Sequence, residues 1–248
     1  MPQRTQRHIK MQIDKTIEKW FQEIEDALGN LSTDKKQTNI FFLITTSLST
    51  FGNYLNTTLM ILKNERRLPA KALLRITGQF ISRVIWVLKS KNGGERQSKL
   101  KRWEKESYCK AKKYDEGIIE FCSKDDERTV IEKRIEGYTE EINKLEESKI
   151  KGLPQPIQIF EQAFGRSILT AGMYSQYHDA IHPDILVLSD TVSENKTDTI
   201  CEGDTKESID SLKQHCLTQA YVFFDEICKY YGFTFKEMAG EYQAMTCA

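Results

Sequence analysis

The chain has 248 residues, in which 36 Lys and Arg are balanced by 36 Asp and Glu, so its formal net charge is zero. Hydrophobic residues make up 39% of the chain and aromatic residues 10%, which excludes collagen-like and disordered proteins. With only 5 Pro and 13 Gly, the chain also lacks the frequent turns of a β-sandwich or barrel. The zero net charge would exclude a nucleic-acid binder only if the charges were evenly distributed.

The first third of the chain predicts three helices, because its apolar residues recur three and four positions apart. The first helix covers about 9–28 and ends at Gly29-Asn30. The second lies in the stretch 37–62, and the third begins near Pro69. The inner face of the third helix is predicted to carry Leu73, Ile76, Phe80, Val84, Val87 and Leu88. Candidate caps are Ser32, Thr33 or Asp34 for the second helix, and Asn92-Gly93-Gly94 closes the third.

The stretch 37–62 contains no charged residue, so it is long enough to be tested as a membrane span. It contains many Ser and Thr, and Asn53 and Asn56 lie within it, which would be costly in lipid. Its strongest apolar residues form one stripe, namely Phe41, Ile44, Leu48, Phe51, Leu55, Leu59 and Leu62. We therefore expect a helix of a soluble bundle and no membrane insertion.

Residues 95–150 have a different pattern, with two narrow apolar stripes between highly charged flanks. Such stripes are typical of an antiparallel helical hairpin, and its turn is predicted at 123–126. The first stripe is Leu100, Trp103, Ser107, Ala111, Tyr114, Ile118 and Phe121, and the second is Ile131, Ile135, Tyr138, Ile142 and Leu145. The predicted architecture is an all-α, multi-helix bundle formed by 1–94 and 151–248, with 95–150 as an inserted, protruding hairpin.

The last part of the chain predicts a helix from Ile157 to about His182, where Pro183 ends it. A polar loop or lid follows at 189–206, and a final helix covers about 207–231 with Gly232 as its C-cap. None of the six Cys has the spacing of a zinc site. Without a recognisable secretory signal, we expect them to be reduced thiols in the cytoplasm.

The charges are segregated along the chain. Residues 63–113 have 16 basic and 4 acidic side chains, a net charge of +12, whereas 114–150 and 183–248 carry −6 and −7. In one interpretation the basic stretch binds the phosphates of RNA; in the other it pairs with the acidic arm of its own hairpin. The candidate nucleic-acid-binding residues are Arg83, Lys89, Lys99, Arg102 and Arg166.

The best candidates for proton-transfer chemistry are His178 and His182, which share a helix face with Tyr174 because the three are spaced by four. The segment 178–182 has the outline of a His-Glu-x-x-His zinc motif with Asp in place of Glu, but no third ligand is evident. The two His can also simply bond the last carbonyls of a helix. We expect no metal and no cofactor.

Two segments resemble a bacterial family of uncharacterised helical proteins, catalogued as a domain of unknown function: 71–79 (Lys-Ala-Leu-Leu-Arg-Ile-Thr-Gly-Gln) and 174–183, with its Tyr174, His178 and His182-Pro183. That family is similar in outline to HEPN bundles, many of which are ribonucleases of toxin and antiphage systems. The resemblance implies a phosphate-holding role for Arg75 and a proton-transfer role for His182. Gln79 and His178 stand where the family has Glu and Ser.

Three functions follow from these observations. The first is a protein-interaction module of a bacterial defence or toxin–antitoxin type system, which binds a protein partner or a second copy through its helices. The second is a HEPN-like, metal-independent ribonuclease or RNA-binding effector that uses His182, His178, Tyr174 and Arg75. The third is a bundle that binds a small molecule or nucleotide, although no glycine-rich phosphate loop is present.

Overall fold

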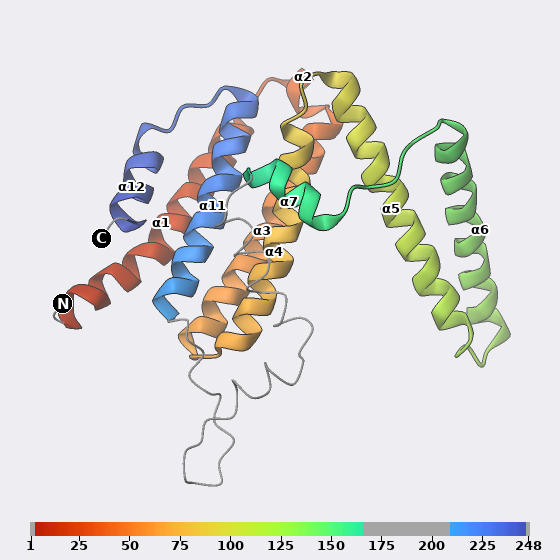
Figure 1. Ribbon diagram of the computed structural model, residues 1–248, viewed down its shortest axis with the longest axis horizontal. Helices are drawn as coiled ribbons and strands as arrows, with labels where there is room; N and C mark the ends of the chain where they lie inside the picture. Colours follow the sequence, from red (N-terminus) through yellow and green to blue (C-terminus); the bar gives the residue numbers. More distant parts are fainter. Residues whose placement is uncertain (1–2, 166–208, 247–248) are drawn as a thin grey trace, which may run out of the picture. The chain divides into compact units, whose positions relative to one another are not determined.

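A computed structural model of the chain describes residues 3–165 and 209–246, with side chains from Ile13 onward (Figure 1). The described residues form nine helices and no strand, which confirms the predicted all-α, multi-helix bundle. The chain divides into two compact units, Met1–Leu88 with Phe160–Ala248 as unit 1, and Lys89–Ile159 as unit 2. The expected hairpin, 95–150, lies within unit 2.

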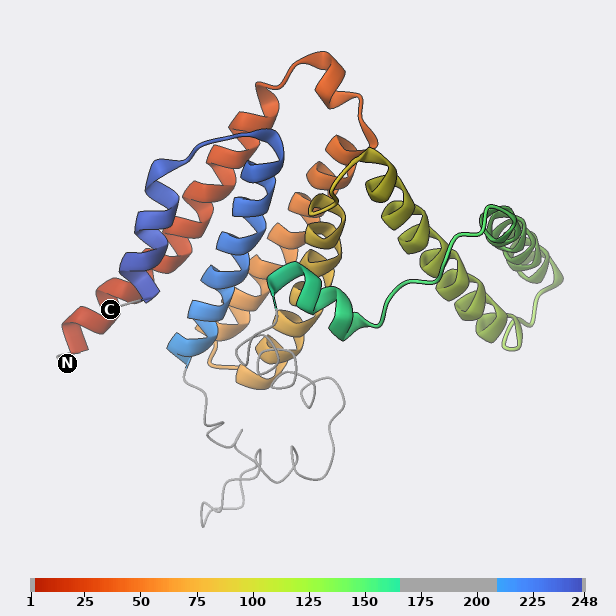
Figure 2. The same ribbon diagram turned by 45° about the horizontal axis from the view of Figure 1, so that its top comes forward.

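Unit 1 is a bundle of long helices. Its elements are α1 (Gln3–Gly29), α2 (Thr33–Lys36), α3 (Asn39–Lys63), α4 (Arg67–Leu88), α11 (Ile209–Tyr231) and α12 (Lys236–Thr246), and it also takes in the end of α7 (Pro156–Phe164). Helix α4 packs on α3 and α11, α1 packs on α11, and α12 lies against both α1 and α11 (Figures 1 and 2).

Aromatic side chains from three helices meet in the core of unit 1. Phe21 of α1 lies edge-on to Phe224 of α11 at 4.8 Å between ring centroids, and Phe51 of α3 lies edge-on to Phe223 at 5.1 Å. Phe51, Phe223 and Phe224 are all inaccessible to solvent. Edge-to-face pairs add to the stabilisation from apolar burial, so these rings fix α1, α3 and α11 as one packed body.

Two predicted helix boundaries were wrong. The N-cap of α3 is Thr38, whose hydroxyl accepts a hydrogen bond from the Phe41 amide at 3.1 Å, while residues 33–36 form the separate short helix α2. Asn92 does not close α4 but caps α5 (Gly93–Ile119), accepting from the Glu95 amide at 2.9 Å. In both cases several cap-forming residues lie close together, and the sequence does not say which one begins the helix. Gly232, with φ of +74°, follows α11 as predicted.

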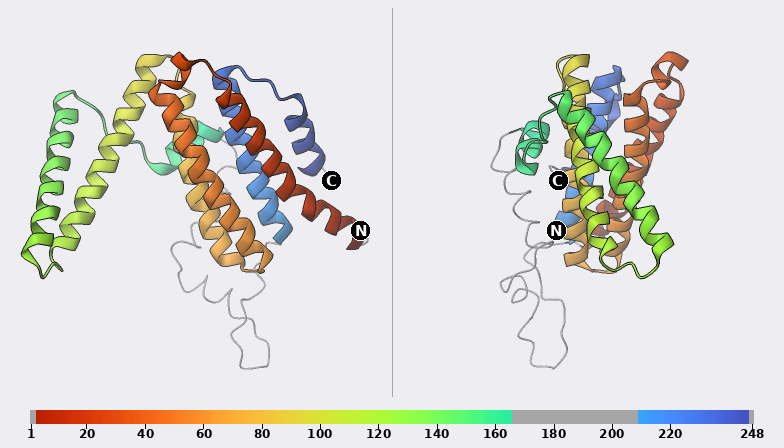
Figure 3. Two further views of the ribbon diagram at one scale, coloured as in Figure 1. Left: turned by 180° about the vertical axis from the view of Figure 1, so that it is seen from behind. Right: turned by 90° about the vertical axis from the view of Figure 1, so that its right-hand side faces the viewer.

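Unit 2 contains the antiparallel pair α5 and α6 (Asp125–Glu147), which lie side by side in the left view of Figure 3. Lys105 pairs with Glu146 at 3.0 Å, and Asp115 pairs with Arg134 at 2.7 Å. The partners therefore run in opposite directions along the two helices. Within the two helices, the buried residues are Lys99, Asp115, Ile131 and Leu145.

The predicted inner faces of α4 and α5 need correction. Ile76 of α4 is 39% exposed, and in α5 and its turn Tyr114 is 68% and Phe121 86% exposed. Asp115 is buried in place of Tyr114, because the less exposed side of α5 carries Ala111, Asp115 and Ile118. A search for large apolar residues selects Tyr114, one position away, and so misplaces the stripe.

None of the helices in the described part of the chain combines the length and apolar character that crossing a bilayer requires. The uncharged stretch 37–62 contributes α3 to unit 1, and all its predicted core residues from Ile44 to Leu62 are buried. The predicted loop 189–206 and the end of the predicted helix 157–182 lie outside the described residues.

Candidate functional site

The sequence-predicted site residues lie in different places. Arg75 lies in the middle of α4 and is 7% exposed. Arg83, also in α4, is partly buried, and Lys89 directly after the helix is exposed. Lys99 and Arg102 belong to α5 in unit 2. The other predicted residues of the catalytic and RNA-binding sets lie outside the described residues, namely Tyr174, His178, His182 and Arg166.

Arg75 directly follows Leu74, whose carbonyl makes a buried polar contact between α4 and α11. The side-chain amide of Gln219 donates a hydrogen bond to the Leu74 carbonyl at 2.9 Å. Gly78 makes this approach possible, because a Cβ at that position would lie 3.2 Å from the Gln219 nitrogen. Gln219 is 3% exposed, and its Oε1 is buried without a hydrogen-bond partner. The crossing therefore places a cation and an amide in the interior of unit 1.

Sequence analysis did not identify Gln219. Gln219 stands among the apolar residues of α11, one residue before Ala220 and four before Phe223, and a single polar residue in a helix does not by itself indicate burial. A Gly in mid-helix was the available signal, since such a glycine often marks a close approach of a neighbouring element. Gly78 is that residue, and Gln219 is what approaches it.

Three basic residues of α5 make contacts within unit 2. Lys99 is 9% exposed and its ammonium lies 3.1 Å from a Glu95 carboxylate oxygen. The Arg102 guanidinium donates two hydrogen bonds to the Gly152 carbonyl, at 2.8 and 2.7 Å. Lys105 reaches across to Glu146 of α6. Of these three contacts, the one between Lys105 and Glu146 is the kind that the pairing interpretation predicts, since Lys99 pairs within α5 and Arg102 bonds a backbone carbonyl.

The turn end of the α5–α6 hairpin presents apolar side chains to solvent. Phe121 is 86% exposed, Tyr114 68% and Val130 58%. The segment 114–130 that contains them has six acidic and two basic residues, a net charge of −4. We call the exposed residues Tyr114, Phe121 and Val130 the hairpin tip. Its aromatic and acidic character matches a protein-binding surface better than a phosphate-binding one.

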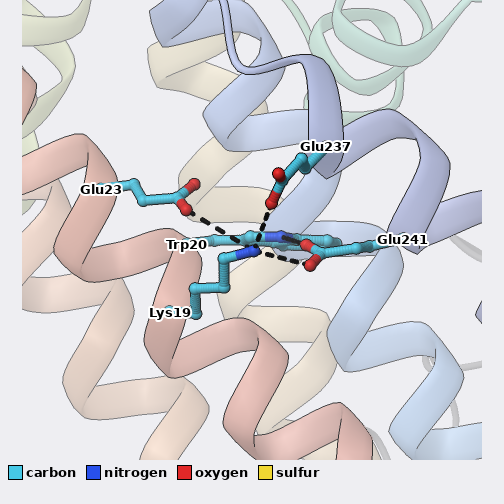
Figure 4. Close-up of polar contacts among 5 residues, drawn as sticks. All are labelled: Lys19, Trp20, Glu23, Glu237 and Glu241. Carbon is cyan, nitrogen blue, oxygen red and sulfur yellow. Dashed lines mark hydrogen bonds and ion pairs between the residues drawn. The ribbon is translucent and has the colours of Figure 1, made fainter.

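The C-terminal helix α12 is held to α1 by a group of ion pairs and hydrogen bonds (Figure 4). Lys19 lies 2.7 Å from Glu241 and 3.0 Å from Glu237, and Trp20 donates from Nε1 to Glu241 at 2.7 Å. Burial acts to raise the pKa of Glu241, but the hydrogen bonds from Lys19 and Trp20 outweigh it and lower the pKa. The hydrogen bonds to Glu241 and then to Glu237 raise the pKa of Lys19.

Aromatic stacking adds to this attachment. The Tyr242 ring of α12 stacks on Tyr221 of α11, with 4.1 Å between ring centroids and 3° between planes. The Tyr242 hydroxyl also lies 3.2 Å from that of Thr218. Because Trp20 is inaccessible to solvent and Glu241 is its acceptor, the group has a structural role in docking α12.

The buried thiols are not nucleophiles at neutral pH. Burial raises the pKa of Cys216 and of Cys228 to about 12. A thiol with such a pKa remains protonated, and the thiolate is the reactive form. Within residues 3–165 and 209–246, no three His, Cys, Asp or Glu side chains are grouped so that they could hold a metal ion.

Comparison with protein-family models, with curated proteins and with solved structures gives no match for this chain.

Proposed function

We propose that this chain is a protein-interaction module whose binding element is the α5–α6 hairpin. The observation that carries the proposal is the hairpin tip, where Phe121, Tyr114 and Val130 are all more than half exposed. All three lie within a few residues of the turn between α5 and α6, and exposed aromatic side chains are frequent anchors in binding sites for other proteins. The resemblance in the sequence suggests the setting, a bacterial defence or toxin–antitoxin type system.

The charges around the tip indicate the kind of partner. The tip segment carries a net charge of −4, whereas Lys99, Arg102 and Lys105 are engaged within unit 2. A partner that fits both features offers an apolar pocket for an aromatic ring, with basic side chains around it. Phosphate groups of RNA would be repelled by the same segment.

Affinity co-purification of the full-length chain from its native cells tests this proposal. Phe121→Asp removes the most exposed ring, and Ser123→Asp, in the same turn, is the matched control that adds the same charge without removing an apolar group. We expect one protein to be recovered with the wild type and the control and lost with Phe121→Asp. With purified components, the dissociation constant for Phe121→Asp should rise at least about tenfold, as for a buried aromatic contact.

Equal binding of wild type and Phe121→Asp would contradict the role of the hairpin tip. Recovery of RNA instead of protein would contradict the interaction-module proposal as a whole. Far-UV circular dichroism of both variants checks that the substitutions, which lie at exposed positions, leave the helices intact.

The second candidate function is RNA cleavage or binding, and the observation that favours it is the buried Arg75. The guanidinium of Arg75 is 7% exposed inside the helical bundle of unit 1, and the resemblance in the sequence gives it a phosphate-holding role. Incubation of the purified chain with total RNA, compared with His182→Ala and Arg75→Lys, tests this function. Cleavage that is absent, or equal in all three proteins, would contradict the ribonuclease activity, and failure of the wild type to retain labelled RNA in a filter-binding assay would contradict RNA binding.

A further inference from the structure

The outer face of α3 is a solvent-exposed surface without charge. The exposed residues of α3 between its first residue and Lys63 are Phe42, Thr46, Ser49, Asn53, Asn56, Thr57 and Met60. Phe42 is 71% and Met60 63% exposed. Charged residues form 29% of the chain, and an exposed helix face normally carries many of them. We call these seven residues the α3 face.

The α3 face is a narrow, straight stripe. Phe42 and Met60 are 18 residues apart, which is five helical turns or about 27 Å, so they lie at the same angle around the helix. Thr46, Ser49, Asn53 and Asn56 follow Phe42 at steps of three and four residues and lie on the same side, with Thr57 beside Asn56 at the edge of the stripe. The stripe therefore has a large apolar residue at each end and hydroxyl and amide side chains between them.

The opposite side of α3 is firmly packed. Its inner residues are buried against the core of unit 1 (Ile40, Ile44, Ser47, Leu48, Phe51, Leu55, Thr58, Leu59 and Leu62). Helix α3 packs on α4 and α11, and Figure 3 shows it in front of α4 when unit 1 is seen from behind. The α3 face is therefore presented in a fixed conformation, which reduces the entropy cost of binding.

We propose that the α3 face is a two-fold interface with a second copy of this chain. The face is nearly symmetric about residue 51, so a two-fold axis there sets Phe42 against the partner's Met60 at both ends. It sets Ser49 against the partner's Asn53 near the centre. A surface without charge needs an uncharged partner surface, and the same face of a second copy provides one. The α3 face is part of unit 1, so this inference does not rest on the hairpin.

The chemistry of the face suits such an antiparallel helix pair. Methionine sulfur makes favourable contacts with aromatic rings, so the Phe42–Met60 pairs act as apolar contacts at the two ends. Ser49 and Thr46 are small enough for helix axes to approach to about 8–10 Å. In this register Asn53 faces the partner's Ser49 and Asn56 faces the partner's Thr46, so each amide can bond a hydroxyl of the second copy, and Thr57 already bonds the Asn53 carbonyl at 2.8 Å.

The oligomeric state of the full-length chain is the first test. Light scattering coupled to size exclusion should give twice the chain mass of 28.8 kDa. Asn53→Lys places two like charges near the axis and should raise the dimer dissociation constant at least about tenfold. The matched control is Gln97→Lys, at an exposed position of α5, and it should leave the dimer unchanged. A wild-type chain that stays monomeric at high concentration would overturn the proposal.

Site-directed cross-linking distinguishes the antiparallel pair from any other dimer. In a background in which Cys109, Cys122, Cys201 and Cys247 are replaced by Ser, one protein carries Phe42→Cys and another Met60→Cys. A short bismaleimide should cross-link a mixture of the two and neither protein alone. Efficient cross-linking of Phe42→Cys to itself would show a parallel or different interface and refute the two-fold geometry.

The same measurements separate this inference from the proposed function. Phe121→Asp in the hairpin should leave the dimer mass unchanged, while Asn53→Lys should leave the partner of the hairpin bound. If Phe121→Asp dissociated the dimer, the second copy would be bound by the hairpin and not by α3, which would contradict this inference and change the identity of the proposed partner.

Discussion

Asp115 and Arg134 form an ion pair in the hairpin, and we predict that replacing one or the other changes the stability of the hairpin in opposite directions. Asp115 is 1% exposed; one of its oxygens pairs with Arg134 at 2.7 Å and the other, Oδ2, is buried without a hydrogen-bond partner. The Arg134 side chain is 51% exposed. The cost of burial therefore falls on the aspartate, while the arginine can return to water.

This difference in burial determines whether each substitution lowers or raises the free energy of unfolding. Arg134→Ala leaves a buried carboxylate without its counter-charge, and we expect the free energy of unfolding to fall. Asp115→Leu removes the carboxylate and its unbonded oxygen and leaves an arginine that is half in water. We expect the hairpin to become more stable by about 1–2 kcal/mol. The double variant should be at least as stable as the wild type.

Hydrogen exchange of α5 and α6, together with urea unfolding followed by circular dichroism, measures these changes in the hairpin itself. Glu116→Leu, at the neighbouring exposed position, is the control for the better helix propensity of leucine and should change stability by less than about 0.5 kcal/mol. If Asp115→Leu destabilised the hairpin as much as Arg134→Ala, the pair would be a net source of stability and this reasoning would fail.

Further predictions concern unit 1. Glu241→Ala should lower the free energy of unfolding by about 2 kcal/mol in urea titrations, because Trp20 loses its acceptor; Glu241→Gln should cost less, and Glu237→Gln, 77% exposed, less than about 0.5 kcal/mol. The pKa of Glu241 is lowered from its ordinary 4.5, so its carboxylate stabilises the fold fully above pH 4.5, and this stabilisation is lost as the pH falls through the lowered pKa. The midpoint temperature of thermal unfolding should therefore fall more on acidification for the wild type than for Glu241→Gln. Gln219→Leu should leave stability unchanged or raise it by about 1 kcal/mol in the same titrations, since it removes an unbonded buried oxygen. Iodoacetamide should label Cys216 only on unfolding, which mass spectrometry can follow, because burial raises its pKa to about 12.

The helices could be predicted where one side faces solvent. The stripe of α3 was predicted correctly from Ile44 to Leu62, because its outer face is polar and the period is clear. In α4 the period fails: Leu74, Ile81 and Ile85 are buried, but so are residues on neighbouring sides of the helix. A central helix buried on several sides has no single apolar stripe, and Ile76 was therefore assigned to the wrong face.

The buried polar groups could not be predicted from residue types. Asp115 and Gln219 are buried by the register and crossing of their helices, which depend on residues far away in the sequence. The Leu74 carbonyl that Gln219 reaches is 145 positions away. Only the glycine that allows the approach, Gly78, has a local signal, and its meaning becomes clear once the neighbouring helix is known.

The basic residues of the stretch 63–113 bear on whether the partner is a protein or RNA. The basic stretch 63–113 has a net charge of +12 in the sequence, and it is divided between unit 1, up to Leu88, and unit 2, from Lys89 onward. Arg75 is buried in unit 1, while Lys99 and Lys105 have acidic partners within unit 2. A phosphate backbone is attracted by the field that remains after such pairing. At the hairpin tip the net charge is negative and the exposed rings are those of Tyr114 and Phe121. These features support the proposal that the hairpin binds a basic, apolar site on a protein rather than RNA.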